Sequence, residues 1–218
     1  MKLSVSRVFL VGEEVARDVF NREEAGELLL SMSNTSQDLP RAVLFDRDGT
    51  LIADVPDNRD PAQVSAMPTA QDAVSLARSA GARVGVITNQ AGVARGLLTS
   101  EDVATVNRRV DELFGTFDVW CVCQHAESDG CECRKPKPGM LLRAAELLGL
   151  APADLAFVGD IGSDVAAGTA AGIRTVLVPT PVTRATEIDS APVVAASLYE
   201  AIDGLFSSDD ASQLEVRG

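Results

Sequence analysis

Between residues 41 and 178, short apolar runs rich in β-branched residues alternate with longer segments of helical character. The predicted strands cover residues 42–45, 83–88, 117–122, 155–158 and 175–178, and the predicted helices cover residues 69–80, 99–115, 138–148 and 163–171. Alternating strands and helices favour a parallel sheet with helices on both faces. We therefore predict an α/β fold with a doubly wound, mostly parallel, Rossmann-like sheet, in which ligands bind at the carboxyl ends of the strands.

Two of these helices carry recognisable start signals. Thr69 is followed three residues later by Asp72, and Thr99 is followed three residues later by Asp102. A threonine hydroxyl and an acidic side chain at this spacing can satisfy the free N–H groups at a helix start. We expect Thr69 to cap its helix and residues 99–102 to open the next one.

The residues outside the alternating region differ from it in composition. Residues 1–40 hold one helix-like stretch, 13–30, followed by the polar, linker-like segment 31–38. Residues 183–218 carry two basic and seven acidic side chains, and residues 207–218 are mostly polar. We predict an accessory helix or poorly ordered leader over residues 1–40, one main domain over residues 41–206, and an acidic, frayed tail over residues 207–218.

The charge balance and hydropathy pattern exclude several classes of partner. The 218 residues carry 19 Lys and Arg against 32 Asp and Glu, for a formal net charge of −13. Because nucleic-acid binding relies on clustered cations, we expect no nucleic-acid partner. The chain has no apolar run of about 18 residues, and residues 1–11 make a poor signal peptide. We expect no membrane partner and a cytoplasmic location; the sequence does not set the oligomeric state, and a monomer is preferred.

All four cysteines lie between residues 121 and 133, and the only histidine, His125, lies in the same window. A disulfide framework would spread its cysteines along the chain, and a cytosol would keep them reduced. Four thiols and the sole imidazole within 13 residues indicate a metal site instead.

Acidic residues follow the first predicted strand directly, in the order Asp46-Arg47-Asp48-Gly49-Thr50. A carboxylate at a strand end can act as a nucleophile and form an aspartyl-phosphate. A second carboxyl group beside it can protonate the leaving oxygen and later activate water. The alternative is a plain acidic turn, because Asp-Gly is a common turn dipeptide.

Three further groups follow later strands or enter helices. Thr88-Asn89-Gln90 ends the second strand, where a hydroxyl and backbone N–H groups can hold phosphoryl oxygens. The segment 134–137 is the densest cationic spot of an acidic chain, so we expect an anionic ligand there. Asp160 follows the fourth strand and is placed as a Mg²⁺ ligand. Asp164 serves either that site or the dipole of its own helix.

This combination of motifs, at residues 46–50, 88–90, 135 and 160, resembles the haloacid dehalogenase (HAD) superfamily of Mg²⁺-dependent phosphatases. The resemblance covers roughly residues 41–182. The runs 88–96 and 133–140 are more particular. They are similar to the D-glycero-D-manno-heptose-1,7-bisphosphate 7-phosphatases and the related histidinol-phosphate phosphatases. That family implies a phosphatase domain with no large cap domain and with a zinc-bound substrate loop.

The resemblance also implies roles for individual residues. Asp46 would be the nucleophile and Asp48 the general acid and base. Mg²⁺ would be held by Asp46, by the backbone carbonyl of Asp48 and by Asp160. The residues implied in phosphate and substrate binding are Thr88, Asn89, Arg95, Arg134 and Lys135. Structural zinc would be held by Cys123, His125, Cys131 and Cys133, with Cys121 left as a buried strand residue.

Two departures from the family pattern bear on the substrate. The segment 55–60 has neither the aromatic residue nor the histidine found after the first motif in the heptose phosphatases, and Ile161 stands where they tend to have lysine. We expect a phosphomonoesterase that uses an aspartyl-phosphate and removes the 7-phosphate of the heptose bisphosphate or of a similar sugar bisphosphate. The alternatives are a histidinol-phosphate phosphatase and, in another class, a non-catalytic module in which zinc shapes a docking loop.

Overall fold

The computed structural model describes residues 39–207 of the chain. The expectations for a leader helix and for a frayed tail therefore lie almost entirely outside the described residues. The centre of the described part is a five-stranded parallel sheet in the order β3-β2-β1-β4-β5. Its strands are β1 (Ala42–Phe45), β2 (Arg83–Asn89), β3 (Val119–Cys123), β4 (Leu155–Gly159) and β5 (Arg174–Leu177).

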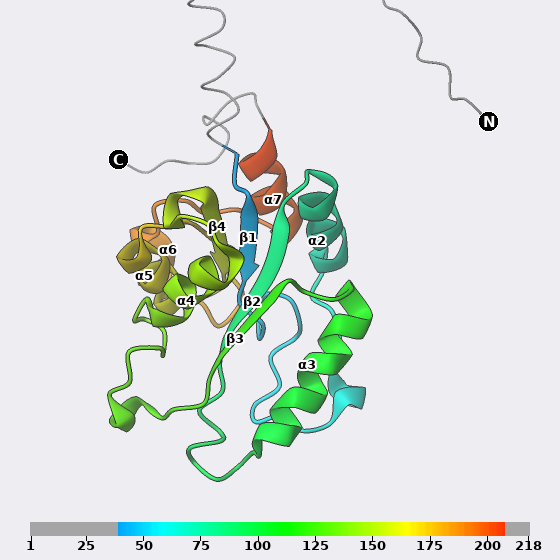
Figure 1. Ribbon diagram of the computed structural model, residues 1–218, viewed down its shortest axis with the longest axis vertical. Helices are drawn as coiled ribbons and strands as arrows, with labels where there is room; N and C mark the ends of the chain where they lie inside the picture. Colours follow the sequence, from blue (N-terminus) through cyan, green and yellow to red (C-terminus); the bar gives the residue numbers. More distant parts are fainter. Residues whose placement is uncertain (1–38, 208–218) are drawn as a thin grey trace, which may run out of the picture. The chain divides into compact units, whose positions relative to one another are not determined.

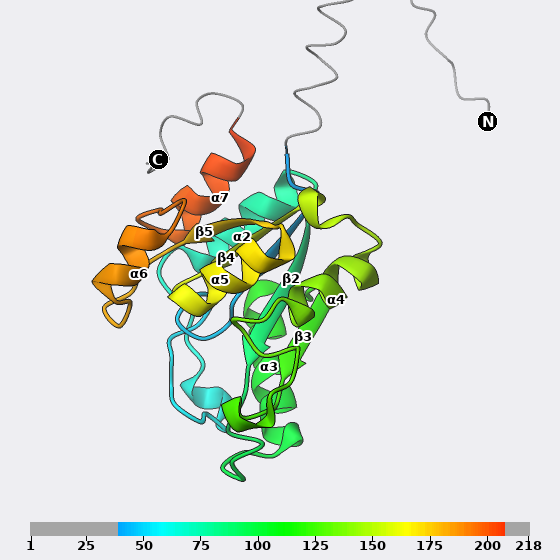
Figure 2. The same cartoon turned by 90° about the vertical axis from the view of Figure 1, so that its left-hand side faces the viewer.

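Helices cover both faces of this sheet (Figures 1 and 2). The helices are α2 (Ala70–Ser79), α3 (Ser100–Phe114), α4 (Gly139–Leu148), α5 (Gly162–Ala171), α6 (Ala185–Ser190) and α7 (Leu198–Phe206). One apolar core joins the sheet to α2, α3 and α7, and a second joins it to α4 and α5. The prediction of a doubly wound, Rossmann-like sheet is confirmed.

The central strand shows why such short apolar runs become strands. All four residues of β1 are fully buried. Val43 and Phe45 contribute to the core on the α2 side, whereas Ala42 and Leu44 contribute to the core on the α4 side. A strand covered on both faces needs an unbroken apolar run, because successive side chains point to opposite faces.

The two predicted helix starts have different outcomes. Helix α3 begins where the sequence predicts, and Thr99 forms a capping box there, since its hydroxyl accepts from the Asp102 N–H and the Asp102 carboxylate accepts from the Thr99 N–H. Thr69 does not cap α2: its backbone is left-handed, with φ 61°, and its side chain makes no capping hydrogen bond. Its hydroxyl accepts instead from the Tyr199 N–H at the start of α7. That prediction was wrong because a tertiary contact took the hydroxyl.

The connection from β1 to α2 matters for access to the strand ends. Residues 46–69 hold a single 3-10 turn, η1 (Pro61–Gln63), and no inserted domain. In Figure 1 this connection descends beside α3, and the loops after β2 and β3 reach the same side of the sheet. The strand ends are therefore bordered by loops, in agreement with the prediction of no large cap domain.

Candidate active site

Three carboxylates meet where the two central strands end. Asp46 follows β1, Asp160 follows β4, and Asp164 lies in the first turn of α5. One oxygen of each lies within 4.8 Å of the others, and all three residues are buried. The turn after Asp46 allows this approach, because Gly49 has φ +82° and a Cβ there would lie 2.4 Å from an Asp160 oxygen. We call Asp46, Asp160 and Asp164 the carboxylate cluster.

A single buried lysine partners this cluster. The Lys135 ammonium group donates to Asp46 Oδ1 and, at 3.0 Å, to the Ile87 carbonyl, and it forms an ion pair of 2.8 Å with Asp164 Oδ1. Its backbone is held by the amide of Asn89, which donates to the Lys135 carbonyl and accepts from the Lys135 N–H, both at 3.2 Å. The end of β2 thus positions the lysine over the end of β1.

The electrostatics of the carboxylate cluster favour a cation. Burial raises the pKa of Asp46 well above its usual range; the Lys135 ammonium opposes this shift, and the neighbouring carboxylates add to it. Burial and the nearby Asp164 carboxylate raise the pKa of Asp160 to about 6. Full ionisation of the three carboxylates beside one ammonium would leave two excess negative charges in a buried space. That charge and the all-oxygen donor set fit one divalent cation of the Mg²⁺ kind.

The Asp48 carboxylate faces a different set of groups. Arg47 Nε donates to both of its oxygens at 3.1 Å, and Arg47 Nη2 forms an ion pair of 3.0 Å with its Oδ2. Gln90 Nε2 donates to its Oδ2 at 2.8 Å, and the Thr88 hydroxyl lies 3.4 Å from the same oxygen. About a fifth of the Asp48 side chain is exposed, whereas Asp46 is almost fully buried. The two aspartates of the first motif therefore have separate environments, one beside the lysine and one nearer solvent.

The second cluster, which we call the thiol cluster, is formed by Cys123, His125, Cys131 and Cys133. Their ligand atoms all lie within 4.8 Å of one another. Sulfur–sulfur distances are 3.3–3.8 Å, and His125 Nδ1 lies 3.6 Å from Cys123 Sγ and 3.2 Å from Cys133 Sγ. A zinc ion bound tetrahedrally through bonds of about 2.0–2.3 Å holds its ligand atoms at distances from one another that are close to those measured here. The four residues fit a closed structural zinc site.

Ionisation of these thiols also points to a bound cation. Burial raises the pKa of Cys133, and the neighbouring thiols of Cys123 and Cys131 raise it further, to about 12. Charge on all three sulfurs therefore needs a positive ion to offset it. The remaining thiol, Cys121, is buried against α4, and burial raises its pKa. As the sequence analysis expected, it lies in β3, apart from the thiol cluster.

Two arginines predicted to bind substrate have different surroundings. The Nη1 atom of Arg134 is buried and has no hydrogen-bond partner among the described residues. Arg95 is about half exposed and forms an ion pair of 2.9 Å with Asp57, in the loop after the first motif. In the same region, Arg59 donates to the Leu97 carbonyl. Arg95 therefore joins two loops, whereas Arg134 keeps an unused donor beside the thiol cluster.

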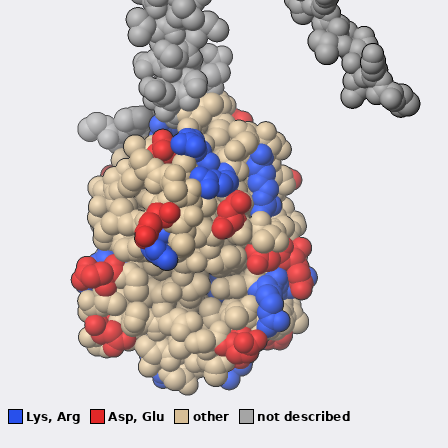
Figure 3. All heavy atoms as spheres, in the orientation of Figure 1, with Lys and Arg blue, Asp and Glu red and all other residues tan. Residues whose placement is uncertain are grey.

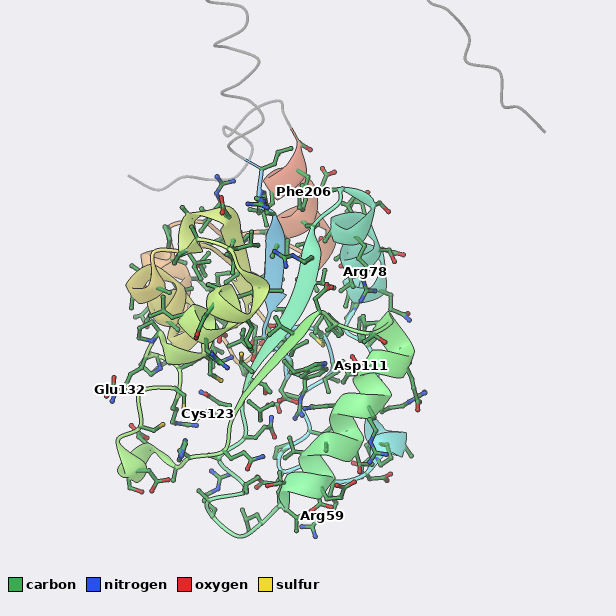
Figure 4. All side chains as sticks on the ribbon, in the orientation of Figure 1. Arg59, Arg78, Asp111, Cys123, Glu132 and Phe206 are labelled. Carbon is green, nitrogen blue, oxygen red and sulfur yellow. The ribbon has the colours of Figure 1, made fainter. Side chains whose placement is uncertain are left out.

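The loop that carries the thiol cluster extends from the end of β3. Figure 4 shows Cys123 near that strand end and Glu132 farther along the loop. On the face in Figure 3, Lys and Arg lie in separate small groups, most of them beside Asp or Glu. None of the helices in residues 39–207 has the length and apolar character needed to cross a membrane.

Sequence reasoning missed two side chains of the site and left a third open. Arg47 is 2% exposed and pairs with Asp48, although it was treated only as the spacer between two aspartates. A charged residue inside a buried turn was the available signal. Asn107, which accepts from Arg47, carried no signal in its own helix. Asp164 was left open between two roles, and its contact with Lys135 shows that it belongs to the carboxylate cluster.

Comparison with known families gives one consistent result. Residues 132–201 match the family model described as HAD-hydrolase-like. The chain is 35% identical over 143 residues to a D-glycero-beta-D-manno-heptose-1,7-bisphosphate 7-phosphatase of Pseudomonas aeruginosa, covering 63% of this chain and 80% of the relative. It is 33% identical over 187 residues to the corresponding phosphatase of Chlorobaculum tepidum, covering 75% of this chain and 93% of the relative.

A solved structure agrees with these relatives. The D,D-heptose 1,7-bisphosphate phosphatase from B. bronchiseptica, complexed with magnesium and phosphate, superposes with a TM-score of 0.69 at 29% identity. The match covers 76% of this chain and 97% of that one. The solved structure therefore shares the fold of this chain over nearly its whole length.

Proposed function

The chain belongs to the HAD-like hydrolases and is a phosphoric monoester hydrolase of that family; on this premise we propose a Mg²⁺-dependent phosphatase that works through an aspartyl-phosphate on Asp46. The substrate we propose is D-glycero-D-manno-heptose 1,7-bisphosphate, cleaved at the 7-phosphate, or a similar sugar bisphosphate. The observation that carries the mechanism is the buried carboxylate cluster with Lys135 across it. The names of the relatives support the substrate.

In the first half of the proposed reaction, an oxygen of Asp46 attacks phosphorus. The bond from phosphorus to the sugar oxygen breaks, and Asp48 gives its proton to that oxygen. Lys135 and Thr88 neutralise and hold the phosphoryl group, which is how phosphoryl transfer is mainly accelerated. In the second half, Asp48 takes a proton from water as the water attacks phosphorus, which releases phosphate and restores the Asp46 carboxylate.

The metal and zinc assignments complete the proposal. Asp46, Asp160 and the backbone carbonyl of Asp48 would hold Mg²⁺, with Asp164 as a further candidate from the same cluster. The ion would neutralise charge on the transferring phosphoryl group. The thiol cluster would hold a structural zinc that shapes the loop around Arg134 and Lys135. Because none of the four cysteines forms a disulfide and zinc binding requires reduced sulfur, we also propose a reducing, cytoplasmic location.

A substrate panel tests this proposal directly. Phosphate release is measured with the heptose 1,7-bisphosphate, the heptose 7-phosphate, histidinol phosphate and para-nitrophenyl phosphate, each with Mg²⁺ and with a chelator. We expect Mg²⁺-dependent turnover with the bisphosphate preferred. A preference for histidinol phosphate would replace the substrate. No turnover of any phosphate would favour the non-catalytic module.

A further inference from the structure

Arg47 is a buried cation that the proposed reaction does not yet use. It lies between the two aspartates of the first motif and is 2% exposed. A buried charge is costly unless it is paired and hydrogen-bonded. Its guanidinium is fully engaged on two sides: Nε and Nη2 contact the Asp48 carboxylate, and Nη1 donates to Asn107 Oδ1 at 2.7 Å.

Asn107 ties this arginine to a helix on the α2 side of the sheet. It lies in the middle of α3, whose apolar residues Val103, Val106 and Val110 are buried in the core. A packed helix is a rigid support, whereas the turn that carries Asp48 is a loop at the mouth of the site. The contacts from Asn107 to Arg47 and from Arg47 to Asp48 therefore fix the Asp48 carboxylate relative to α3.

The contacts of Asp48 divide its two oxygens. Oδ2 lies within hydrogen-bond distance of Arg47, of Gln90 at 2.8 Å and of the Thr88 hydroxyl at 3.4 Å. Among the described residues, Oδ1 receives a hydrogen bond only from Arg47 Nε, at 3.1 Å. A carboxylate oxygen has about two lone-pair sites, so Oδ1 keeps room for a proton and Oδ2 does not.

We infer that Arg47 is a positioning residue, held by Asn107, that orients Asp48 so that Oδ1 is the oxygen that exchanges the proton. This inference rests on the proposed function, in which Asp48 is the general acid and base. A guanidinium suits the task because its planar fork contacts both oxygens of one carboxylate and still offers a third donor to the helix. Lysine, as a compact point charge, cannot do this.

The test uses leaving groups that differ in their need for a proton. Phosphate esters of para-nitrophenol, phenol and a simple alkyl alcohol are compared by kcat/KM, which reports the steps up to release of the alcohol. Arg47→Met should lower kcat/KM by about 100-fold for the alkyl ester and by less than about threefold for the para-nitrophenyl ester, since only poor leaving groups need the acid. Asn107→Ala should cause a loss of about tenfold for the alkyl ester, from one hydrogen bond to a charged group.

Matched variants separate the possible failures. Arg108→Met removes an exposed arginine next to Asn107 on α3 and should leave every ratio unchanged. Asp48→Asn should show the same dependence on leaving group as Arg47→Met, only larger. If Asp48→Asn lowers kcat/KM by the same factor for all the esters, the proposed role of Asp48 is wrong, and the inference is wrong with it.

In another outcome, Asp48→Asn lowers kcat/KM more for poor leaving groups, but the variants at residues 47 and 107 lower it equally for all the esters. That result overturns only the positioning role of Arg47. Loss of folded protein lowers the apparent kcat/KM for every ester by the same factor, so the melting temperature of each variant is measured beside the kinetics. If Arg47→Met does not fold, Arg47→Lys and Asn107→Ala carry the test. A steeper dependence on leaving group in either variant supports the inference, and a parallel decrease in both overturns it.

Discussion

The carboxylate cluster and the thiol cluster both gather ligand atoms within 4.8 Å, but they are built in opposite ways. The thiol cluster takes its four residues from an 11-residue stretch of chain, 123–133, and three of the four are only partly buried or exposed. The carboxylate cluster takes its residues from the ends of two strands and the start of a helix, 118 positions apart between Asp46 and Asp164, and all are buried.

The difference concerns what holds each group together. The carboxylates are held by the sheet and by one buried lysine, so their mutual repulsion acts on the stability of the whole domain. Cys123 is fixed at the end of β3, but the other three residues lie in the following loop, which has little apolar content, so a metal ion would keep them beside Cys123. We therefore expect changes in the carboxylate cluster to affect catalysis and global stability, and changes in the thiol cluster to affect the loop and its substrate contacts.

The largest expected effect is on turnover. Asp46→Asn should lower kcat by at least about 1000-fold, because the amide cannot attack phosphorus. Removing one of three buried like charges relieves repulsion, so the melting temperature should stay the same or rise. Phosphate-release assays and thermal melting measure the two quantities, with Asp203→Asn on the exposed side of α7 as control. Activity above a few per cent of wild type would remove Asp46 from the role of nucleophile.

Lys135 and Lys137 allow a comparison between a buried ion pair and an exposed one. Lys135→Met leaves the buried carboxylates without their ammonium partner and should cost about 3–5 kcal/mol of unfolding free energy. Lys137 pairs with Glu132 at the surface, and Lys137→Met should cost less than about 1 kcal/mol. Urea unfolding followed by circular dichroism measures both. Equal costs would mean that the carboxylate cluster does not depend on its lysine.

Selectivity should respond to the loop beside the thiol cluster. Arg134→Ala should lower kcat/KM for a sugar bisphosphate by about 10- to 150-fold, from one lost charge-assisted contact, and should lower it much less for a monophosphate. Steady-state kinetics on the two substrates check this ratio, and Arg143→Ala, an exposed arginine of α4, is the control. An equal loss on both substrates would show that Arg134 does not contact the second phosphate.

The smallest expected effect on the domain comes from the thiol cluster. Purified protein should contain about one zinc per chain. Cys121→Ser should keep it, and Cys131→Ser should lose it while changing the unfolding free energy of the sheet by less than about 1 kcal/mol. Elemental analysis and urea unfolding measure the two quantities. Equal zinc loss in both variants would contradict the assignment of Cys121. A large loss of unfolding free energy in Cys131→Ser would show that the thiol cluster, like the carboxylate cluster, stabilises the whole domain.

Much of the fold could be predicted because its signals are local. The four apolar residues of β1 and the start of α3 appear in the structure where the sequence places them. Helices α6 and α7 were not predicted, although α7 packs against α2 and completes a core. Thr69 was assigned a local role that a contact with α7 overrides. Local patterns fail where a distant segment competes for the same group.

The residues of the site also divide into those that local sequence patterns predict and those that depend on tertiary contacts. The sequence by itself indicated a metal site within residues 121–133 and candidate carboxylates at the strand ends, because spacing along the chain and strand direction are both local properties. The choice of four ligands that leaves out Cys121 came from the family resemblance. Only the tertiary structure decided that Asp164 joins Lys135, that Asn89 holds the backbone of Lys135, and that Arg47 connects Asp48 to Asn107 of α3. Asp164 and Lys135, Lys135 and Asn89, and Asn107 and Arg47 are 29, 46 and 60 positions apart, and contacts over such separations exist only once the sheet and helices have packed.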